Sequence, residues 1–392
     1  MDSFDFYSPT YFVFGRGREN EAGAYVKKFG GSRVLVVYGG QSAKKSGLLD
    51  RIQASLSTAG LYTAELGGVR PNPRSGIVYE GISLCRRERI DFLLAVGGGS
   101  VIDTAKAIAM GAVYDGDFWD FFSGKVPEAA LPVGTVLTIA ASGSEGSPDS
   151  IITHEQTLEK TAAEADCLRP KFSILDPALT ESLSPFQTAC GITDIMSHAF
   201  ERYFTNTPHV ETTDRMLEGV LLAMLHEGRR VLEDPHDYDA RANIMRAGMV
   251  CHNDIMGVGR RQDWNSHHLE HVLSAVYDCA HGAGLAVIMP AWMRYCVEHH
   301  DGMRFAQMAS RVFGCEMDFS DPKRTARAGV EAFRAFLRTI GMPLSFEEIG
   351  ADAKDIPKLV EMNHIGGGVT GGYVGLDRQA HFEIYEIAAG MR

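Results

Sequence analysis

The sequence predicts two domains, an α/β domain over residues 1–182 and an all-helical domain over residues 183–392. Three observations support this prediction. Short apolar runs alternate with amphipathic segments in the first domain, and apolar periodicity of the helical type replaces them after Leu183. The length of 392 residues is enough for two hydrophobic cores. Strands that alternate with helices indicate a mainly parallel, doubly wound sheet in the first domain.

The expected strands of the first domain are mostly continuous apolar runs, as in strands that are buried on both faces. They cover residues 34–38, 62–66, 92–96, 133–138 and 172–175. Helices are expected over residues 48–59, over residues 75–87 after a Pro-Asn-Pro turn, and from Val101 onward. This order of elements is that of a Rossmann-like domain.

The second domain shows helical periodicity throughout. The periodic segments are residues 184–204, 209–232, 239–255, 263–286, 291–313 and 324–340. No strand is expected between them, which is typical of an all-helical domain. Glycines at 366–368 and 371–372 predict a mobile loop, for which a plain connector is the simplest role.

The composition argues against several classes of protein. The formal net charge of −12 disfavours nucleic acid or an anionic membrane as the main partner. No apolar run reaches the roughly 18 residues that a membrane span needs, and the acidic, aromatic first residues predict no secretory signal. The seven cysteines are scattered and form no CxxC pair, which is typical of reduced thiols. We therefore expect a cytoplasmic protein.

Two glycine-containing turns follow expected strands. Gly97-Gly98-Gly99-Ser100 follows strand 92–96 and opens a helix, so its backbone N–H groups can approach a phosphate. It is neither GxGxxG nor a P-loop, and a plain strand-to-helix turn is the alternative. The turn after strand 34–38 consists of Gly39, Gly40, Gln41 and Ser42, with Lys44 and Lys45 nearby. An acidic residue there would select NAD, so its absence favours NADP, with an ordinary turn and solvated lysines as the alternative.

Asp194 and His198 are four residues apart, so they lie on one helical face and are spaced to reach one divalent ion. A pair with this spacing also arises by chance. It gains weight because the expected helix 185–204 has few other polar residues on that face.

Segment 263–286 contains four histidines, and His267 and His271 share one helical face. His281 lies ten residues after His271, which is roughly 15 Å along an unbroken helix. It can join the same site only if the helix ends near 278–279, a break that Gly282 and Gly284 permit. A histidine-rich surface or core helix is the alternative interpretation.

Together these patterns indicate a metal site and a dinucleotide site. Carboxylate and imidazole without thiolate suit Fe(II), Zn(II) or a similar first-row ion. A metal ion used together with a nicotinamide suggests alcohol–aldehyde interconversion by hydride transfer, with the ion as Lewis acid. Two alternatives remain open: a metal-dependent hydrolase or lyase whose GGGS turn binds a substrate phosphate, and a non-catalytic metal- or aldehyde-binding protein.

Several segments, taken in order, support a family resemblance that covers essentially the whole chain. They are Phe14-Gly15, Tyr38-Gly39-Gly40, Pro71-Asn72-Pro73, GGGSVIDTAK at 97–106, TIAASGSE at 138–145, Leu175-Asp176-Pro177, GITDIMSHAFE at 191–201 and segment 263–286. The chain resembles the iron-containing (group III) alcohol dehydrogenases, especially the butanol-dehydrogenase-like branch that reduces aldehydes. The resemblance implies a dehydroquinate synthase-like architecture. A zinc-dependent glycerol dehydrogenase or dehydroquinate synthase-like enzyme is the alternative within that architecture.

The resemblance also implies roles for individual residues. The implied metal ligands are Asp194, His198, His267 and His281. His271 matches an active-site histidine that is not a ligand and relays a proton, while His268 matches no functional position. The implied cofactor contacts, besides the turn after strand 34–38, are Asn72, Gly98, Gly99, Ser100, Asp103, Thr138, Ser142 and Lys160.

The expected ligands and partners follow. We expect NADP, with NAD as the alternative, Fe(II) or Zn(II), and a small alcohol or aldehyde as substrate. Phe118, Trp119, Phe121 and Trp264 are candidates for the substrate pocket, although aromatic residues are commonly plain core. We expect a homodimer or a higher homo-oligomer, and no apolar stripe marks its interface.

Overall fold

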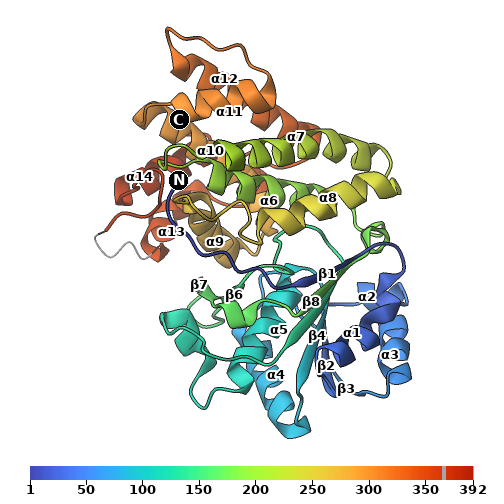
Figure 1. The fold of residues 1–392 in the computed structure, drawn as a ribbon. Helices are drawn as coiled ribbons and strands as arrows, with labels where there is room; N and C mark the ends of the chain where they lie inside the picture. The colour runs from blue at the N-terminus through green and yellow to red at the C-terminus, as the bar shows by residue number, and fades with distance from the viewer. Residues whose placement is uncertain (364–367, 392) are drawn as a thin grey trace. The chain divides into compact units, whose positions relative to one another are not determined.

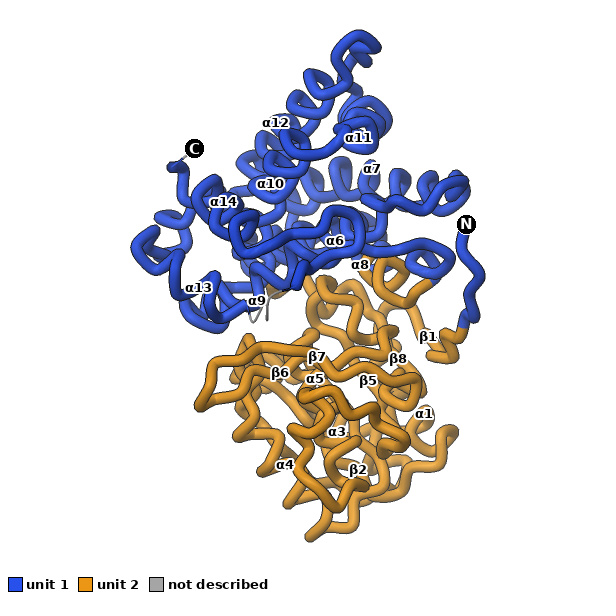
Figure 2. Tube along the Cα trace, turned by 90° about the vertical axis from the view of Figure 1, so that its left-hand side faces the viewer, with its two compact units in different colours: residues 1–6, 184–247, 255–392 blue, residues 7–183, 248–254 orange. Residues whose placement is uncertain are grey.

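The computed structural model describes residues 1–363 and 368–391, and the chain forms two compact units (Figure 2). Unit 1 consists of residues 1–6, 184–247 and 255–392, and unit 2 consists of residues 7–183 and 248–254. Two short segments, residues 1–6 and 248–254, therefore belong to the opposite unit from the one that a single boundary after residue 182 would give. That residues 1–182 and 183–392 are separate domains stays a prediction.

Unit 2 is built on a six-stranded, fully parallel sheet (Figure 1). The strands, in their order across the sheet, are β1 (Tyr11–Phe14), β8 (Phe172–Leu175), β5 (Val133–Leu137), β4 (Phe92–Gly97), β2 (Arg33–Tyr38) and β3 (Tyr62–Leu66). Five of these strands were predicted, and the parallel, doubly wound fold class is confirmed. The edge strand β1 was not predicted, although its sequence YFVF is a short apolar run, and two of its four residues are exposed.

The strand order reverses between β2 and β4. β3 lies on one side of β2 and β4 lies on the other. Ligands of open α/β sheets bind outside the carboxyl ends of the strands at such a reversal. The residues that follow β2 and β4 are the two glycine-containing turns of the sequence. The topology therefore predicts a ligand site at the same two turns.

Helices cover both faces of this sheet (Figure 1). The helices of unit 2 are α1 (Ala22–Lys28), α2 (Ser42–Lys45), α3 (Leu48–Thr58), α4 (Ser75–Glu88) and α5 (Gly99–Ala112), with short 3₁₀ turns η1 (Arg18–Glu21), η2 (Phe118–Ser123), η3 (Asp166–Leu168) and η4 (Pro177–Thr180). Alternate residues of β2 and β4, including Val36 and Leu94, pack with α1 and α3 in one apolar cluster. The residues between them, such as Leu35 and Leu93, are equally buried, as expected for strands covered on both faces.

A two-stranded antiparallel sheet, β6 (Asp149–Thr153) with β7 (Lys160–Glu164), was not predicted. The sequence of β7 is KTAAE, which has few of the β-branched and aromatic residues that mark strands. Its pairing with β6 therefore depends on a partner strand that local sequence patterns do not reveal.

Unit 1 is helical, as predicted. Its helices are α6 (Pro185–Tyr203), α7 (Glu211–Glu233), α8 (Tyr238–Cys251, whose end lies in unit 2), α9 (Asn265–Tyr277), α10 (His281–His299), α11 (Met303–Phe313), α12 (Pro322–Thr339), α13 (Ile356–Met362) and α14 (Arg378–Ala388), with 3₁₀ turns η5 (Glu347–Ile349) and η6 (Ala353–Asp355). Helices α13 and α14 were not predicted. Among the helices of the described residues, none combines the length and apolar character that crossing a bilayer requires.

Two predictions about helix ends have opposite outcomes. The predicted break before His281 is confirmed: α9 ends at Tyr277, Asp278 caps it with a left-handed φ of 52°, and α10 begins at His281. The single segment predicted over 291–313 is wrong. It spans two helices, α10 and α11, because Gly302 adopts a φ of 73° just before α11.

The predicted mobile glycine loop is only partly described. Residues 366 and 367 lie outside the described residues. Gly371 and Gly372 belong to a packed turn, because the Asp263 carboxylate accepts backbone N–H groups from residues 372–374 at 3.0, 2.7 and 3.4 Å. A Cβ atom on either glycine would overlap Asn265 or Gln262. This part of the segment is therefore packed against the start of α9, and its mobility stays a prediction.

Candidate active site

Helix α6 carries the first two predicted metal ligands. It begins at Pro185 with a capping box, in which the hydroxyl of Ser184 accepts the backbone N–H of Gln187 at 3.2 Å. Helical spacing then places Asp194 and His198 on one face. Both are buried, and Asp194 Oδ1 lies 3.2 Å from His198 Nδ1.

The start of helix α9 is tied to α6 and brings His267 to the same place. Trp264 precedes the helix with a left-handed φ of 71°, and its backbone N–H donates to the Glu201 carboxylate of α6 at 2.7 Å. The backbone N–H of Asp263 donates to the carbonyl of Glu201 at 3.0 Å. As a result His267 Nε2 lies 4.0 Å from Asp194 Oδ1.

Helix α10 supplies the third member of the group from its first residue. His281 Nε2 lies 3.7 Å from Asp194 Oδ1. The next residue, Gly282, packs directly on the backbone of Cys190 in α6, and a Cβ atom at this position would overlap that backbone. The missing side chain therefore permits the close approach of α10 to α6 that brings His281 near Asp194.

These side chains form a cluster that fits a divalent cation. Asp194, His267 and His281 each offer one ligand atom, and these atoms lie within 4.8 Å of one another. Two ligands at about 2.1 Å from one zinc ion would be about 3.4 Å apart, slightly closer than here. Asp194 Oδ1 and His267 Nε2 are buried and make no hydrogen bond to any residue that the structure describes, which is costly unless a ligand satisfies them. His198 lies beside this group, with its ring centroid 4.7 Å from that of His267.

A buried carboxylate lies against the other ring nitrogen of two of these histidines. His267 Nδ1 is 2.8 Å from Glu201 Oε1, and His281 Nδ1 contacts Glu270 Oε2. Burial by itself would raise the pKa of Glu201, but hydrogen bonds from His267 and Ser266 outweigh it and hold that pKa below its usual value. Glu201 is therefore ionised at neutral pH and accepts the hydrogen bond from His267.

His271 lies next to the cluster on α9. Its ring centroid is 6.5 Å from that of His267 and 5.7 Å from that of His281, and its side chain is partly exposed. Glu270, His271 and His281 also offer three ligand atoms within 4.8 Å of one another. His268, by contrast, is exposed. The ring of Trp264 is 5.1 Å from that of His267.

The two loops predicted to hold the dinucleotide pack together at the carboxyl ends of β4 and β5. The backbone N–H of Thr138 donates at 3.0 Å to the carbonyl that ends β4. A Cβ atom at Gly98 would overlap Ile139, and one at Gly99 would overlap the hydroxyl of Ser142. The two glycines therefore let the GGGS turn lie against the segment after β5 without displacing these side chains.

Two buried, oppositely charged residues of α5 hold the continuation of that segment. Lys106 of α5 has no exposed surface, and its ammonium donates to the carbonyls of Ser144, Ser147 and Asp149 at 2.7, 2.9 and 2.8 Å. Asp103 accepts from the hydroxyl of Ser144 at 2.6 Å. Burial raises the pKa of Asp103 to about 6 and lowers that of Lys106 to about 8, and the attraction between the two charges limits both shifts. Asp103 thus holds this loop, and its direct contact with a cofactor stays a prediction.

The remaining predicted cofactor residues form two small groups in unit 2. Asn72 and Lys160, 88 residues apart in the sequence, are joined by a hydrogen bond of 3.0 Å from Lys160 Nζ to Asn72 Oδ1. After β2, the side chains of Gln41 and Ser42 are exposed. A hydrogen bond with the Tyr38 hydroxyl raises the pKa of the exposed Lys44, so it carries its charge at neutral pH.

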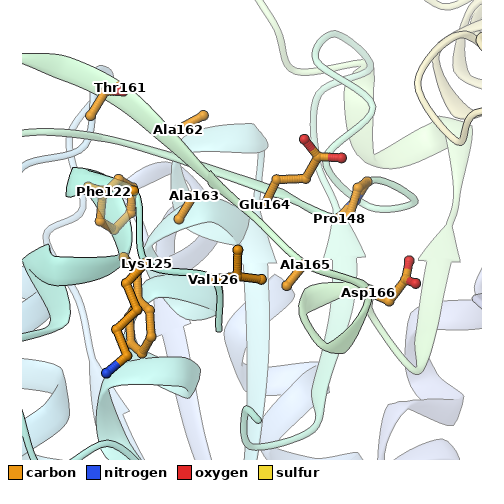
Figure 3. A pocket seen from close by; sticks show the side chains of 12 residues that line it. Phe122, Lys125, Val126, Pro148, Thr161, Ala162, Ala163, Glu164, Ala165 and Asp166 are labelled. Carbon is orange, nitrogen blue, oxygen red and sulfur yellow. The ribbon is translucent and has the colours of Figure 1, made fainter. Parts of the chain in front are cut away.

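A separate open pocket lies between η2 and β7 (Figure 3). Phe121, Phe122, Lys125 and Val126 line it on one side, and residues 161–166 line it on the other. Phe121 is one of the residues that the sequence makes a candidate for the substrate pocket. It is 6% exposed, and its neighbour Phe118 is 1% exposed, so both are core residues. The predicted metal and cofactor residues do not line this pocket.

Comparisons with known proteins agree with this geometry. A family model described as iron-containing alcohol dehydrogenase matches residues 9–177, and one described as the C-terminal part of the Fe-containing alcohol dehydrogenase family matches residues 188–386. The chain belongs to the iron-containing alcohol dehydrogenase family. It is 43% identical to the probable NADH-dependent butanol dehydrogenase 2 of Bacillus subtilis, over 94% of this chain and 95% of that protein.

Two further relatives of this alcohol dehydrogenase family member are informative. The NADPH-dependent aldehyde reductase YqhD of Escherichia coli is 36% identical, over 92% of both chains. The crystal structure of NADH-dependent butanol dehydrogenase A from Thermotoga maritima is 38% identical, covers 99% of both chains and superposes with a TM-score of 0.95. The fold and the family resemblance inferred from the sequence are therefore confirmed.

The sequence-based predictions for this alcohol dehydrogenase did not include Glu201 and Glu270. Glu201 follows Asp194 by seven residues and His198 by three, which is the spacing of a single helical face. This spacing was a usable signal for Glu201. Glu270 contacts a histidine of the next helix, and no local spacing predicts that contact.

Proposed function

We propose that this protein interconverts primary alcohols and aldehydes with a nicotinamide dinucleotide, and that aldehyde reduction with NADPH is its principal reaction. The observation that carries the proposal is the cluster of Asp194, His267 and His281 from three helices. It occurs in a chain whose relatives are named butanol dehydrogenases and an aldehyde reductase. A metal-dependent hydrolase or lyase finds no comparable support.

In this proposal Asp194, His198, His267 and His281 hold one divalent ion, Fe(II) or Zn(II). When bound, that ion supplies Lewis acidity toward a substrate oxygen, and a reduced nicotinamide supplies a hydride. The donor set supports a first-row ion because it combines one carboxylate with imidazoles and includes no thiolate.

The chain's own contribution to proton movement is assigned to His271. Aldehyde reduction requires that the substrate oxygen gain one proton. His271 lies beside the cluster on α9 and is partly exposed, so it can exchange a proton with water. A general acid or base must lie within hydrogen-bond reach of the group that it serves, directly or through one water.

The choice of NADP over NAD is supported by the turn after β2. No acidic residue stands in Gly39–Ser42, the positions at which a carboxylate would bind a ribose 2′-hydroxyl. The exposed side chains of Gln41, Ser42 and the charged Lys44 suit a 2′-phosphate instead. The residues proposed to contact the rest of the cofactor are Asn72, Gly98, Gly99, Ser100, Asp103, Thr138, Ser142 and Lys160. A homo-oligomeric state and a cytoplasmic location also remain predictions.

The test is reconstitution of metal-free protein with Fe(II) or Zn(II) under anaerobic conditions. Loss of NADPH and of NADH absorbance is then followed separately with butanal. We expect consumption of the reduced cofactor only after metal addition, with a higher kcat/KM for NADPH than for NADH. Preference for NADH would overturn the cofactor assignment alone. Consumption of neither cofactor with either metal would overturn the proposed function.

A further inference from the structure

Two buried glutamates link the three helices of the metal cluster in sequence. Glu201 of α6 holds His267 of α9, and Glu270 of α9 holds His281 of α10. Each contact joins a carboxylate oxygen to Nδ1 of the ring. Each carboxylate therefore contacts the histidine that the next of these helices along the chain contributes.

The contacts determine which ring nitrogen faces the cluster. A neutral imidazole has one N–H donor, and a carboxylate that accepts at Nδ1 fixes the proton there. The lone pair then lies on Nε2 of both His267 and His281. These Nε2 atoms are the ones that lie 4.0 and 3.7 Å from Asp194 Oδ1, so the two glutamates turn the correct atoms toward a metal ion.

The surroundings keep both carboxylates in place. Neither Glu201 nor Glu270 has exposed surface. Glu201 also accepts the backbone N–H groups of Trp264 at 2.7 Å and His267 at 3.2 Å. Glu270 packs against Gly284 so closely that a Cβ atom there would overlap its carboxylate. Their positions are therefore set by the fold and do not depend on solvent.

We propose that Glu201 and Glu270 are the positioning residues of the metal centre. They orient His267 and His281 for coordination, and they supply negative charge that balances the ion. One ligand carboxylate with neutral imidazoles leaves a divalent ion with an excess positive charge in a buried site, which is unfavourable. The two further carboxylates more than offset that single excess charge. This inference rests on the metal site of the proposed function.

The experiment measures metal affinity without any substrate. Chelator-treated wild-type, Glu270→Gln and Glu201→Gln proteins are titrated with Zn(II) against a competing chelator, and Co(II) spectra are recorded in parallel. Glutamine keeps the shape and an acceptor oxygen but removes the charge. We expect affinity to fall by about 10–100-fold in each variant, with a changed Co(II) spectrum, because outer-shell partners typically have effects of this size. Metal-free melting temperatures show that the variants fold, and a folded Glu270→Gln protein suffices by itself for the test.

Two controls separate positioning from general stability. Glu218 of α7 is also a buried carboxylate of unit 1, and it accepts a hydrogen bond of 2.9 Å from the Tyr203 hydroxyl. It belongs to neither of the two groups of candidate metal ligands. Glu218→Gln should keep wild-type metal affinity. In a His281→Ala background, Glu270→Gln should cost less affinity than it does in the wild-type protein, because the part of its effect that acts through that histidine is already lost.

The outcomes distinguish this inference from the proposed function. Wild-type affinity and spectrum in both glutamate variants, or an equal loss in Glu218→Gln, would overturn the positioning role alone. A wild-type protein that takes up no stoichiometric Zn(II) or Co(II) would overturn the metal site itself and, with it, both proposals.

Discussion

At the scale of single residues, His271 and His268 are neighbours on α9 with different surroundings. His271 faces the cluster, and His268 is exposed. We expect the His271→Ala variant to keep its metal but to have a kcat lower by about 10²–10⁴-fold, the range typical of a general acid or base. The measurement combines metal content with steady-state kinetics of butanal reduction.

His268→Ala is the matched control, since it removes an adjacent imidazole from the same helix without changing the cluster. Its kcat should stay close to that of the wild type. Loss of metal from His271→Ala would contradict the relay role and would make His271 a ligand, as the second group of Glu270, His271 and His281 allows.

Residue spacing alone left the ligand set ambiguous. His267 and His271, four residues apart, were the obvious pair, while His281 needed a helix break to take part. The structure brings His281 within 3.7 Å of Asp194 because α9 ends at a left-handed Asp278. The glutamates behind the histidines were not predicted at all. Such contacts between helices depend on packing, which a single helical period does not encode.

At the scale of elements, the contact of α10 with α6 depends on a missing side chain. Gly282→Ala would improve helix propensity, yet its Cβ atom would overlap the backbone of Cys190. Backbone atoms cannot move aside as a flexible side chain does. We therefore expect the overlap to outweigh the gain in helix propensity and to lower the free energy of unfolding by about 1–3 kcal/mol. We also expect weaker Zn(II) binding, because His281 moves with the start of α10. Thermal unfolding and chelator competition measure the two effects.

Gly219→Ala provides the comparison. Gly219 lies within helix α7, and no atom lies within 4 Å of the position that its Cβ would occupy. The substitution should therefore raise stability by up to about 1 kcal/mol through helix propensity and leave Zn(II) binding unchanged. Equal behaviour of the two alanine variants would show that the α6–α10 contact tolerates a methyl group.

Elements with strong internal patterns were predictable, and elements that depend on partners were not. The buried strands β2, β4, β5 and β8 and the amphipathic helices α3 and α4 follow from local apolar patterns. Strand β7 is polar and alanine-rich, and it forms because β6 pairs with it. The 291–313 segment kept an apolar pattern across two helices, so periodicity alone did not reveal the turn at Gly302.

At the scale of the whole molecule, the metal ion and the dinucleotide are proposed to bind different units of the chain. Every proposed metal ligand and both positioning glutamates belong to unit 1, and every proposed cofactor contact belongs to unit 2. A ligand that binds only the folded state stabilises it by an amount set by its concentration and affinity, about 2.7 kcal/mol at 100 times Kd. Each ligand should therefore act first on the backbone of the unit that binds it.

Hydrogen exchange resolved by peptide tests this division. Removing the metal by chelation should increase amide exchange in α6, α9 and α10, because the ion joins residues from these three helices. Peptides covering β2 and β4 should not change. Adding NADPH to the metal-free protein should instead slow exchange at the start of α5 and in the segment after β5. Equal responses of both units to each ligand would contradict this assignment, since the stabilisation would then not follow the residues proposed to bind.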